Sequence, residues 1–177
     1  MKQASVNQGS GMRWVVMGVC GCGKSTVGHQ LAAAHGVAYV EGDAFHPSAN
    51  VAKMSAGEPL NDDDRVDWLR ALKEQIRVAR DSEVGLVLSC SALKRSYRDL
   101  LREADPALRF AHLHGPRELI AERLSARQDH FMSPLLLDSQ LAALEPLGRD
   151  EAGVYLDIRH APGQLVAEIL ANEGGSS

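Results

Sequence analysis

The sequence predicts an α/β fold with three layers, in which helices cover both faces of a five-stranded parallel sheet. Five short apolar runs alternate with segments of helical periodicity, and this alternation is typical of βαβ units. The first apolar run leads through a glycine-rich loop directly into a helical segment. With 177 residues, of which 45% are hydrophobic and 24% charged, the chain is long enough for one domain with a substantial core.

The glycine-rich loop, residues 18–25, follows the pattern G-x-x-x-x-G-K-[ST], which binds phosphate groups. In this pattern backbone N–H groups surround the phosphates, Lys24 reaches the β- and γ-phosphates, and the hydroxyl of Ser25 binds Mg²⁺. A predicted strand at Arg13–Met17 and a predicted helix at Lys24–His35 supply the strand–loop–helix context that the pattern requires. We therefore expect a bound nucleotide with Mg²⁺, held by Gly18, Gly21, Cys22, Gly23, Lys24, Ser25 and Thr26.

Beyond Gly36, which is a plausible helix C-terminal glycine, residues 37–41 indicate a second strand that ends at Gly42-Asp43. Residues 45–60 are loop-like, with room for one short helix. The acidic cluster at residues 61–64 is typical of a helix N-cap with carboxylates facing the macrodipole. It opens a long amphipathic helix to about Arg80, whose predicted apolar face comprises Val66, Leu69, Leu72, Ile76 and Ala79.

The remaining chain repeats the order of strand and helix. Predicted strands lie at 84–90, 109–114 and 154–158, and predicted helices at 96–104, 116–127, 134–144 and 162–172, with Pro116 at a first helical position. Residues 45–64 and 123–134 interrupt this order, and insertions on the ligand side of such a sheet are commonly lids or substrate-binding parts. We predict one domain at 13–172, with a substrate-binding insertion at 45–64, a lid at 127–134, and tails at 1–12 and 173–177.

Charge and cysteine content argue against several classes of protein. A net charge of −4 and a pI near 6.0 leave no basic footprint for nucleic acid. The sequence has neither the apolar core of a signal peptide nor a run of about 18 apolar residues that could span a membrane. Three cysteines form no disulfide framework, and Cys20-x-Cys22 without a nearby Cys/His cluster is a weak metal signal. We expect a cytoplasmic protein without nucleic-acid or membrane partners.

Phosphoryl transfer needs cations at the γ-phosphate and a base that faces the acceptor hydroxyl. Asp43 follows the second strand, where a sheet of this kind binds its ligand, so it is the candidate general base; the alternative is a turn residue after Gly42. Arg123 and Arg127, four residues apart on one helical face, are candidates to clamp the nucleotide, with Arg127 joining Lys24 in catalysis. The alternative is a pair of solvated arginines on an amphipathic helix.

Three further residues are candidates for an anionic substrate. Arg98 offers the guanidinium fork that best holds a carboxylate, and Lys94 adds positive charge without directionality. His46 lies close to Asp43 in the sequence, although a single histidine is as often structural.

Several blocks of the sequence resemble the gluconate kinase family in order and spacing, over about Val15 to Leu170. The most specific blocks are Pro-Leu-Asn-Asp-Asp-Asp-Arg at 59–65 and Cys-Ser-Ala-Leu-Lys at 90–94, and further matches are 42–47, Trp68-Leu69, Tyr97-Arg98, His130-Phe131 and Ser139-Gln140. The resemblance implies a P-loop fold of the nucleoside-monophosphate-kinase type, with strand order 2-3-1-4-5. It also implies Mg²⁺, a homodimer, a mobile lid at 127–134, and ATP-dependent phosphorylation of D-gluconate at its terminal hydroxyl to 6-phospho-D-gluconate.

The resemblance places Asp43, His46, Arg65, Lys94 and Arg98 around the sugar acid, and leaves open which cation meets the carboxylate. Two other functions remain open from the residues: a related kinase for another sugar acid or polyol, and a nucleotide-dependent switch without turnover. The Asn-Lys-x-Asp motif of guanine-specific switches is absent from the sequence.

The phosphate-binding loop departs from the family at two positions, because Cys20 and Cys22 stand where serine is usual. A helix N-terminus beside Lys24 lowers a thiol pKa. We therefore expect oxidants or alkylating agents to inactivate the protein and ATP to protect it.

Overall fold

The computed structural model describes residues 11–127 and 134–174. Within them, five parallel strands form one sheet in the order β2-β3-β1-β4-β5, which confirms the predicted fold class and strand order. The strands are β1 (Arg13–Met17), β2 (Ala38–Glu41), β3 (Leu86–Ser89), β4 (Arg109–His114) and β5 (Gly153–Asp157). Central β1 pairs with β3 and β4, where Val15 lies opposite Leu88 and Phe110.

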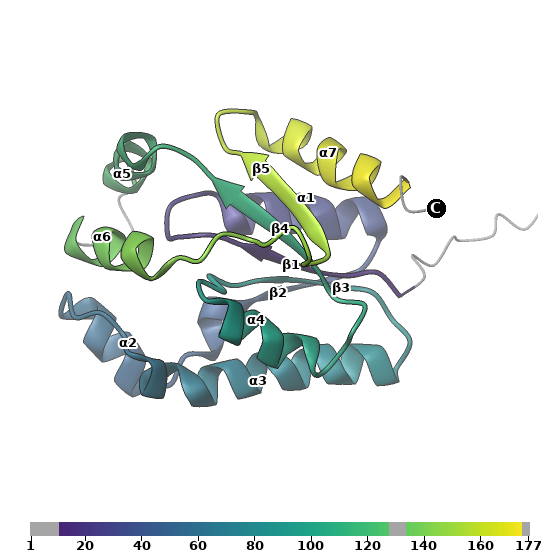
Figure 1. The fold of residues 1–177 in the computed structure, drawn as a ribbon, viewed down its shortest axis with the longest axis horizontal. Helices are drawn as coiled ribbons and strands as arrows, with labels where there is room; N and C mark the ends of the chain where they lie inside the picture. Colours follow the sequence, from purple (N-terminus) through teal and green to yellow (C-terminus); the bar gives the residue numbers. More distant parts are fainter. Residues whose placement is uncertain (1–10, 128–133, 175–177) are drawn as a thin grey trace, which may run out of the picture.

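Helices cover both faces of this sheet and make the expected three layers (Figure 1). One face carries α1 (Lys24–His35), α5 (Arg117–Ser125) and α7 (Pro162–Gly174), and the other carries α3 (Asp62–Asp81) and α4 (Arg95–Arg102). Two further helices, α2 (Ser48–Ser55) and α6 (Pro134–Ala143), lie near one end of the sheet (Figure 1). No helix in the described ranges is long and apolar enough to cross a membrane.

The core lies on both sides of the three central strands, as expected for a parallel sheet covered on two faces. Its largest fully buried side chains come from strands and from helices of both layers, and include Trp14, Phe110, Leu31, Leu72 and Leu101. The carboxyl ends of the strands are therefore fixed in position, and the loops that follow them gather at one edge of the sheet.

The insertion at residues 45–64 contains one short helix, α2, as predicted. A 3-10 turn at Gly42–Phe45 precedes it, and a capping box starts α3: Asp64 N donates to the Asn61 side chain and Asn61 N donates to the Asp64 carboxylate. The expected N-cap is thus confirmed.

Several local predictions need correction. Val66 is 37% exposed, because α3 turns Arg65 and Trp68 inward, and the Trp68 indole donates to Gly42 O at 2.8 Å. Pro116 is the N-cap of α5, one residue before the helix, with an extended ψ of 141°. Strand β3 is shorter than predicted at both ends, and β5 begins and ends one residue earlier. Helix α7 continues to Gly174, two residues into the predicted C-terminal tail, and the Trp14 indole donates to the Glu173 carboxylate at 2.6 Å. The rest of the two predicted tails, apart from residues 11 and 12, and residues 128–133 of the predicted lid lie outside the described residues.

Candidate active site

The phosphate-binding loop joins β1 to α1 and has backbone angles that favour glycine. Gly21 and Gly23 have φ of 83° and 91°. A Cβ on Gly21 would lie 2.6 Å from Leu124 Cγ, so the loop packs closely against α5. The ammonium of Lys24 donates to Val19 O at 3.0 Å and thus spans the loop. The strand–loop–helix context required by the motif is confirmed.

Two cavities open on either side of this loop. The larger has a volume of about 290 Å³ and is lined by Cys20, Lys24, Asp43, His46, Val51, Met54, Ser55, Pro59, Leu60, Arg65, Trp68, Ser91, Leu136, Ser139 and Gln140. The smaller has a volume of about 270 Å³ and is lined by Gly21, Cys22, Gly23, Thr26, Val27, Arg123, Arg127, Ile158, His160, Pro162 and Leu165. Successive residues of one loop therefore face two separate spaces.

The smaller cavity brings the predicted arginine pair beside the phosphate-binding loop. Arg123 lies in the last turn of α5, and Arg127 lies beyond the end of this helix at Ser125, which comes earlier than predicted. Arg123 donates to Ile158 O at 2.8 Å. This bond fixes the first guanidinium against the segment that follows β5, while the second is exposed. Two positive charges thus flank a loop whose backbone N–H groups are typical phosphate ligands.

The larger cavity gathers Asp43, His46 and Arg65 from three segments: the turn after β2, the start of the insertion, and the first turns of α3. The imidazole of His46 stacks on Trp68, with ring centroids 4.2 Å apart. Burial lowers the pKa of His46, and nearby Arg65 lowers it further against the opposing effect of Asp43. His46 is therefore a neutral hydrogen-bonding group at pH 7.

Arg65 is 8% exposed and donates to the Tyr97 hydroxyl at 3.0 Å. This bond comes from one terminal nitrogen, and within the described ranges no hydrogen bond is formed by the other guanidinium nitrogens. Arg65 therefore presents a positive charge with free donors to the wall of the larger cavity.

Glu41, at the end of β2, is a site residue that the sequence reasoning missed. The Ser25 hydroxyl donates to its carboxylate at 2.6 Å, and Tyr39 and Ser89 also donate to it. Burial alone would raise the pKa of Glu41, but these three hydrogen bonds outweigh it and lower the pKa. The sequence did carry a signal, since Glu41 is the second carboxylate at the end of the same strand as Asp43.

Ser25 and Glu41 together present a hydroxyl and a carboxylate oxygen, the ligand types that Mg²⁺ prefers. Among the described residues no group of three or more His, Cys, Asp or Glu side chains is arranged to hold a metal. The site therefore fits an ion that is held by one or two protein oxygens together with nucleotide phosphates, which is the usual arrangement for Mg²⁺.

Comparison with known proteins agrees with this geometry. A model of the shikimate kinase family, whose P-loop domain this chain shares, matches residues 20–172. Gluconokinase of Gluconobacter oxydans (strain 621H) is 46% identical over 156 residues, covering 88% of this chain and 88% of that protein. The chain belongs to the gluconokinase family.

Solved structures of high similarity support this membership. A gluconokinase from Sinorhizobium meliloti 1021 has a TM-score of 0.85 at 46% identity, covering 93% of this chain and 92% of that one. An unliganded sugar kinase from Janibacter sp. HTCC2649 has a TM-score of 0.88 at 48% identity, covering 92% and 94% of the two chains. The resemblance to the gluconokinase family that the motifs indicated is therefore confirmed.

Two residues that the gluconokinase resemblance placed at the sugar acid are held elsewhere. Lys94 donates to the Asp62 carboxylate at 2.9 Å and is not among the residues that line the larger cavity. Arg98 is fully buried and forms a bidentate pair with Glu151, at 2.8 and 3.0 Å. For Arg98 the expected substrate contact is replaced by a structural role, because its donors are already taken by protein acceptors.

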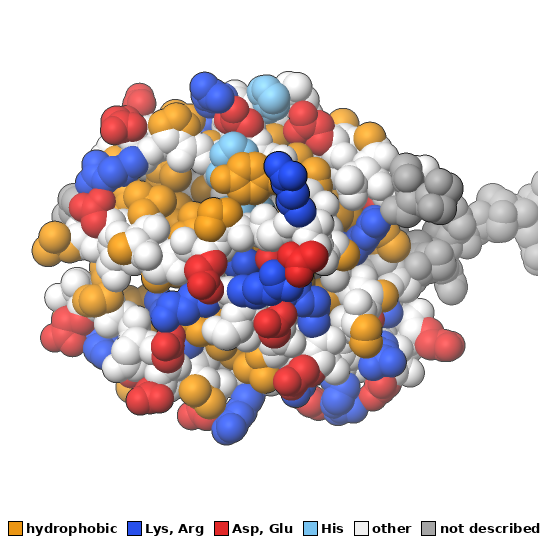
Figure 2. Space-filling view, in the orientation of Figure 1, with side chains coloured by type: hydrophobic (Ala, Val, Ile, Leu, Met, Phe, Trp, Pro, Cys, Tyr) orange, Lys and Arg blue, Asp and Glu red, His pale blue; other side chains and the backbone are white. Residues whose placement is uncertain are grey.

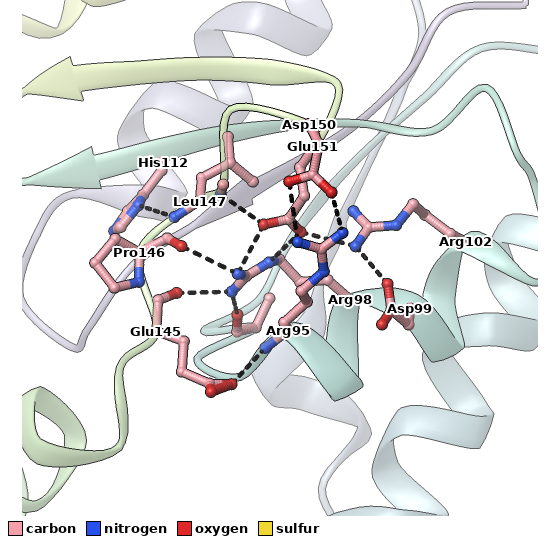
Figure 3. A network of polar contacts seen from close by, with 12 residues as sticks. Arg95, Arg98, Asp99, Arg102, His112, Glu145, Pro146, Leu147, Asp150 and Glu151 are labelled. Atoms are coloured by element: carbon pink, nitrogen blue, oxygen red, sulfur yellow. Dashed lines mark hydrogen bonds and ion pairs between the residues drawn. The ribbon is translucent and has the colours of Figure 1, made fainter.

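Figure 3 shows how Arg98 joins α4 to the segment before β5. Its guanidinium also donates to the carbonyl groups of Ala92 and Glu145, at 2.9 and 3.0 Å. Arg102 adds a second contact to Glu151 at 2.7 Å. The network thus fixes the loop after β3, which carries Ser91 of the larger cavity, and the chain that directly follows α6, whose Leu136, Ser139 and Gln140 also line this cavity.

The two loop cysteines of this gluconokinase family member do not have the expected acidity. Burial raises the pKa of the Cys20 thiol to about 11, which outweighs the opposing effect of Lys24. Cys22 is 1% exposed, and burial raises its pKa as well. The prediction of lowered thiol pKa values was wrong, because it considered the helix N-terminus and Lys24 but not desolvation.

Proposed function

We propose that this protein catalyses the ATP-dependent phosphorylation of D-gluconate at its terminal hydroxyl, giving 6-phospho-D-gluconate. The observation that carries the proposal is that one phosphate-binding loop forms a wall of both cavities. A γ-phosphate held at this loop lies between a nucleotide in the smaller cavity and an acceptor in the larger one. Membership of the gluconokinase family supports gluconate as that acceptor.

ATP binds to the loop through its phosphates. The backbone N–H groups of residues 21–26 and the ammonium of Lys24 neutralise the phosphate charge. Arg123 and Arg127 supply further positive charge from the side of α5. Because phosphoryl transfer depends on positioning and electrostatic stabilisation, these groups provide most of the catalytic effect.

Mg²⁺ would be held by Ser25 and, directly or through water, by Glu41. When bound, the ion neutralises charge on the transferred phosphoryl group and orients the phosphates. In this protein Glu41 also receives hydrogen bonds from Tyr39 and Ser89, which hold its carboxylate ionised and in a fixed orientation beside Ser25.

Asp43 accepts the proton of the acceptor hydroxyl. Its side chain is exposed in the larger cavity, which Lys24 also lines. Within the described part of the chain no hydrogen bond engages its carboxylate, so it is free to bind a substrate hydroxyl. The carboxylate and the transferred phosphoryl group therefore approach that hydroxyl in one space, as general base catalysis requires.

Arg65 is the residue that we assign to the substrate carboxylate. Apart from Lys24, which serves the phosphates, it is the one arginine or lysine among the described residues that line the larger cavity. Its free donors suit a carboxylate. Neutral His46, beside it, suits a hydroxyl group of the sugar acid.

A substrate panel tests the proposed reaction. Product formation is measured with ATP and Mg²⁺ for D-gluconate, other aldonates, polyols, shikimate and AMP. We expect kcat/KM for D-gluconate to exceed that of every other acceptor by at least about tenfold, because Arg65 requires an anion and the hydroxyl groups must match the cavity. Equal turnover of a neutral polyol would contradict the assignment.

The variant Asp43→Asn tests the base. We expect kcat to fall about a hundredfold or more, because the amide cannot accept the hydroxyl proton, while ATP affinity is unchanged. Asp63→Asn is the matched control, since Asp63 is an exposed acid on α3 outside both cavity linings. Near-normal turnover of Asp43→Asn would refute this role.

A further inference from the structure

The Ser139-Gln140 pair belongs to the blocks that resemble the gluconokinase family, yet neither residue has a role in the reaction described above. Both lie on α6 and line the larger cavity. Gln140 is distinguished by a contact with the phosphate-binding loop, since Cys20 N donates to its side-chain Oε1 at 2.8 Å.

This contact fixes the orientation of the Gln140 amide. A backbone N–H can only donate, so the atom that faces Cys20 must be the oxygen, and the NH₂ group must point elsewhere. Within the described ranges, Nε2 donates to no protein acceptor, although Gln140 lines the cavity. The side chain thus has one end bound to the phosphate-binding loop and two donors available to a ligand.

The packing of α6 holds this amide in place. Leu136 and Leu137 are 5% and 1% exposed and attach the helix to the body of the protein. Beyond the helix end, Glu145 N donates to Leu93 O at 2.7 Å, and Glu145 O accepts from Arg98 at 3.0 Å. Because α6 is fixed both by its buried leucines and by the chain that follows it, the Gln140 amide is preorganised for a ligand and loses little conformational entropy on binding.

We propose that Gln140 is a specificity-determining residue, whose NH₂ group donates to the substrate hydroxyl next to the one that is phosphorylated. This inference rests on the proposed function, because it takes D-gluconate as the acceptor. The contact with Cys20 N places the amide against the phosphate-binding loop, in the cavity that Lys24 of the same loop also lines. The hydroxyl within reach of this amide is therefore the one on C5, beside the reacting C6 hydroxyl.

A bound substrate that lacks this hydroxyl leaves a desolvated donor without a partner. Sites built to hydrogen-bond a hydroxyl discriminate strongly against analogues that lack it. We expect the protein to prefer D-gluconate over 5-deoxy-D-gluconate in kcat/KM by about 10- to 100-fold, as one unpaired buried donor implies. The matched control substrate is 3-deoxy-D-gluconate, which lacks a hydroxyl two carbons farther from the reacting end.

The test compares two variants across these three substrates. Gln140→Met removes both the donor and the acceptor, and Gln140→Glu keeps an acceptor for Cys20 N while removing the NH₂ donors. In Gln140→Met we expect the ratio of kcat/KM for D-gluconate to that for 5-deoxy-D-gluconate to fall to about threefold or less. In Gln140→Glu the second carboxylate oxygen can accept a hydrogen bond from the same hydroxyl, so the ratio should fall by a smaller factor. The ratio for 3-deoxy-D-gluconate is expected to stay within twofold of the original protein.

A structural role would lower kcat/KM for all three substrates together and leave both ratios unchanged. An unchanged 5-deoxy ratio in both variants therefore overturns the role of Gln140 and leaves the proposed function intact. If the original protein does not phosphorylate D-gluconate, both proposals are overturned. Asp138→Asn, on the same helix but paired with Arg117 at 2.6 Å, is the control variant and should change neither ratio.

Discussion

Arg65 and Arg98 occupy equivalent positions in neighbouring helices, yet they have different surroundings. Each is the fourth residue of its helix, α3 or α4, on the same face of the sheet, and each is buried. Arg98 makes a bidentate pair with Glu151 and donates to several carbonyl groups, whereas Arg65 makes one hydrogen bond to Tyr97 among the described residues. A buried guanidinium with all donors taken stabilises the fold, and one with free donors beside a cavity is available to a ligand.

The distribution of charge on the surface is consistent with this difference between Arg65 and Arg98. In Figure 2, Lys and Arg side chains are interspersed with Asp and Glu over the visible face, so this face as a whole is neither positive nor negative. Positive charge that matters for an anionic substrate must therefore be presented locally, inside a cavity, where burial strengthens its effect. Arg65 meets this condition, and Arg98 does not.

The largest expected effect comes from removing Arg98. In Arg98→Met, the Glu151 carboxylate remains buried without its bidentate partner, and we expect the free energy of unfolding to fall by about 3–5 kcal/mol. Urea unfolding monitored by circular dichroism measures this change. Arg95→Met is the control, because the pair between Arg95 and Asp150 is exposed and should contribute far less. Equal losses in the two variants would contradict the structural role of Arg98.

The corresponding change at Arg65 should affect binding more than stability. For Arg65→Met we expect kcat/KM for D-gluconate to fall about a hundredfold, mainly through KM, since a carboxylate in the cavity loses its charge-assisted hydrogen bonds. The KM for ATP should stay within about threefold, because Arg65 does not line the smaller cavity. A fall in kcat with unchanged KM would instead indicate a role in the transition state.

These two arginines also show what the sequence could and could not predict. The fold class and most helix bounds follow from periodicity, caps and one motif, because these signals are local, whereas the strand order is implied only by the resemblance to a known family. The difference between Arg65 and Arg98 is not local. Glu151, the partner that engages Arg98, lies 53 residues away in the sequence, and no pattern around Arg98 indicates it.

Other misses have the same cause. Val66 has the right spacing for the buried face of α3, but the hydrogen bond from Trp68 to Gly42 decides which side of the helix turns inward. The thiols at Cys20 and Cys22 lie beside Lys24, but their depth in the protein decides their pKa values. Burial and long-range pairing depend on the complete fold, so they became known only with the structure.

A smaller effect is expected in the pH dependence of the free energy of unfolding, through the Glu151 carboxylate that pairs with Arg98. Burial would raise the pKa of Glu151, but hydrogen bonds from Arg98, Gly148 N and Arg102 outweigh it and lower the pKa to about 2. Because the folded-state pKa is below the unfolded value of 4.5, the stabilisation is present above pH 4.5 and is lost as the pH falls toward 2.

We therefore expect the stability difference between the original protein and Arg98→Met to shrink by roughly 2 kcal/mol over this range, after allowance for solvent screening. Urea unfolding at several pH values from 6 to 2 measures it. Burial, together with His114 and Arg98, lowers the pKa of His112 to about 4, so the original protein also loses stability between pH 6.5 and 4. Because Arg98→Met changes this contribution too, the test of Glu151 uses the change in the difference below pH 4. A difference that is constant with pH would show that Glu151 does not depend on Arg98.

The smallest effect is expected at Lys94, which the family resemblance placed at the substrate. Its ammonium is paired with Asp62, and Asp62 also accepts from Tyr97, the partner of Arg65. Lys94 is thus connected to Arg65 through two intervening side chains but does not line the cavity. For Lys94→Met we expect the KM for D-gluconate to rise by less than about threefold, because a partly exposed charge outside the cavity is screened by solvent. A rise as large as that of Arg65→Met would mean that Lys94 leaves Asp62 when the substrate binds, and the carboxylate would then be shared between two cations.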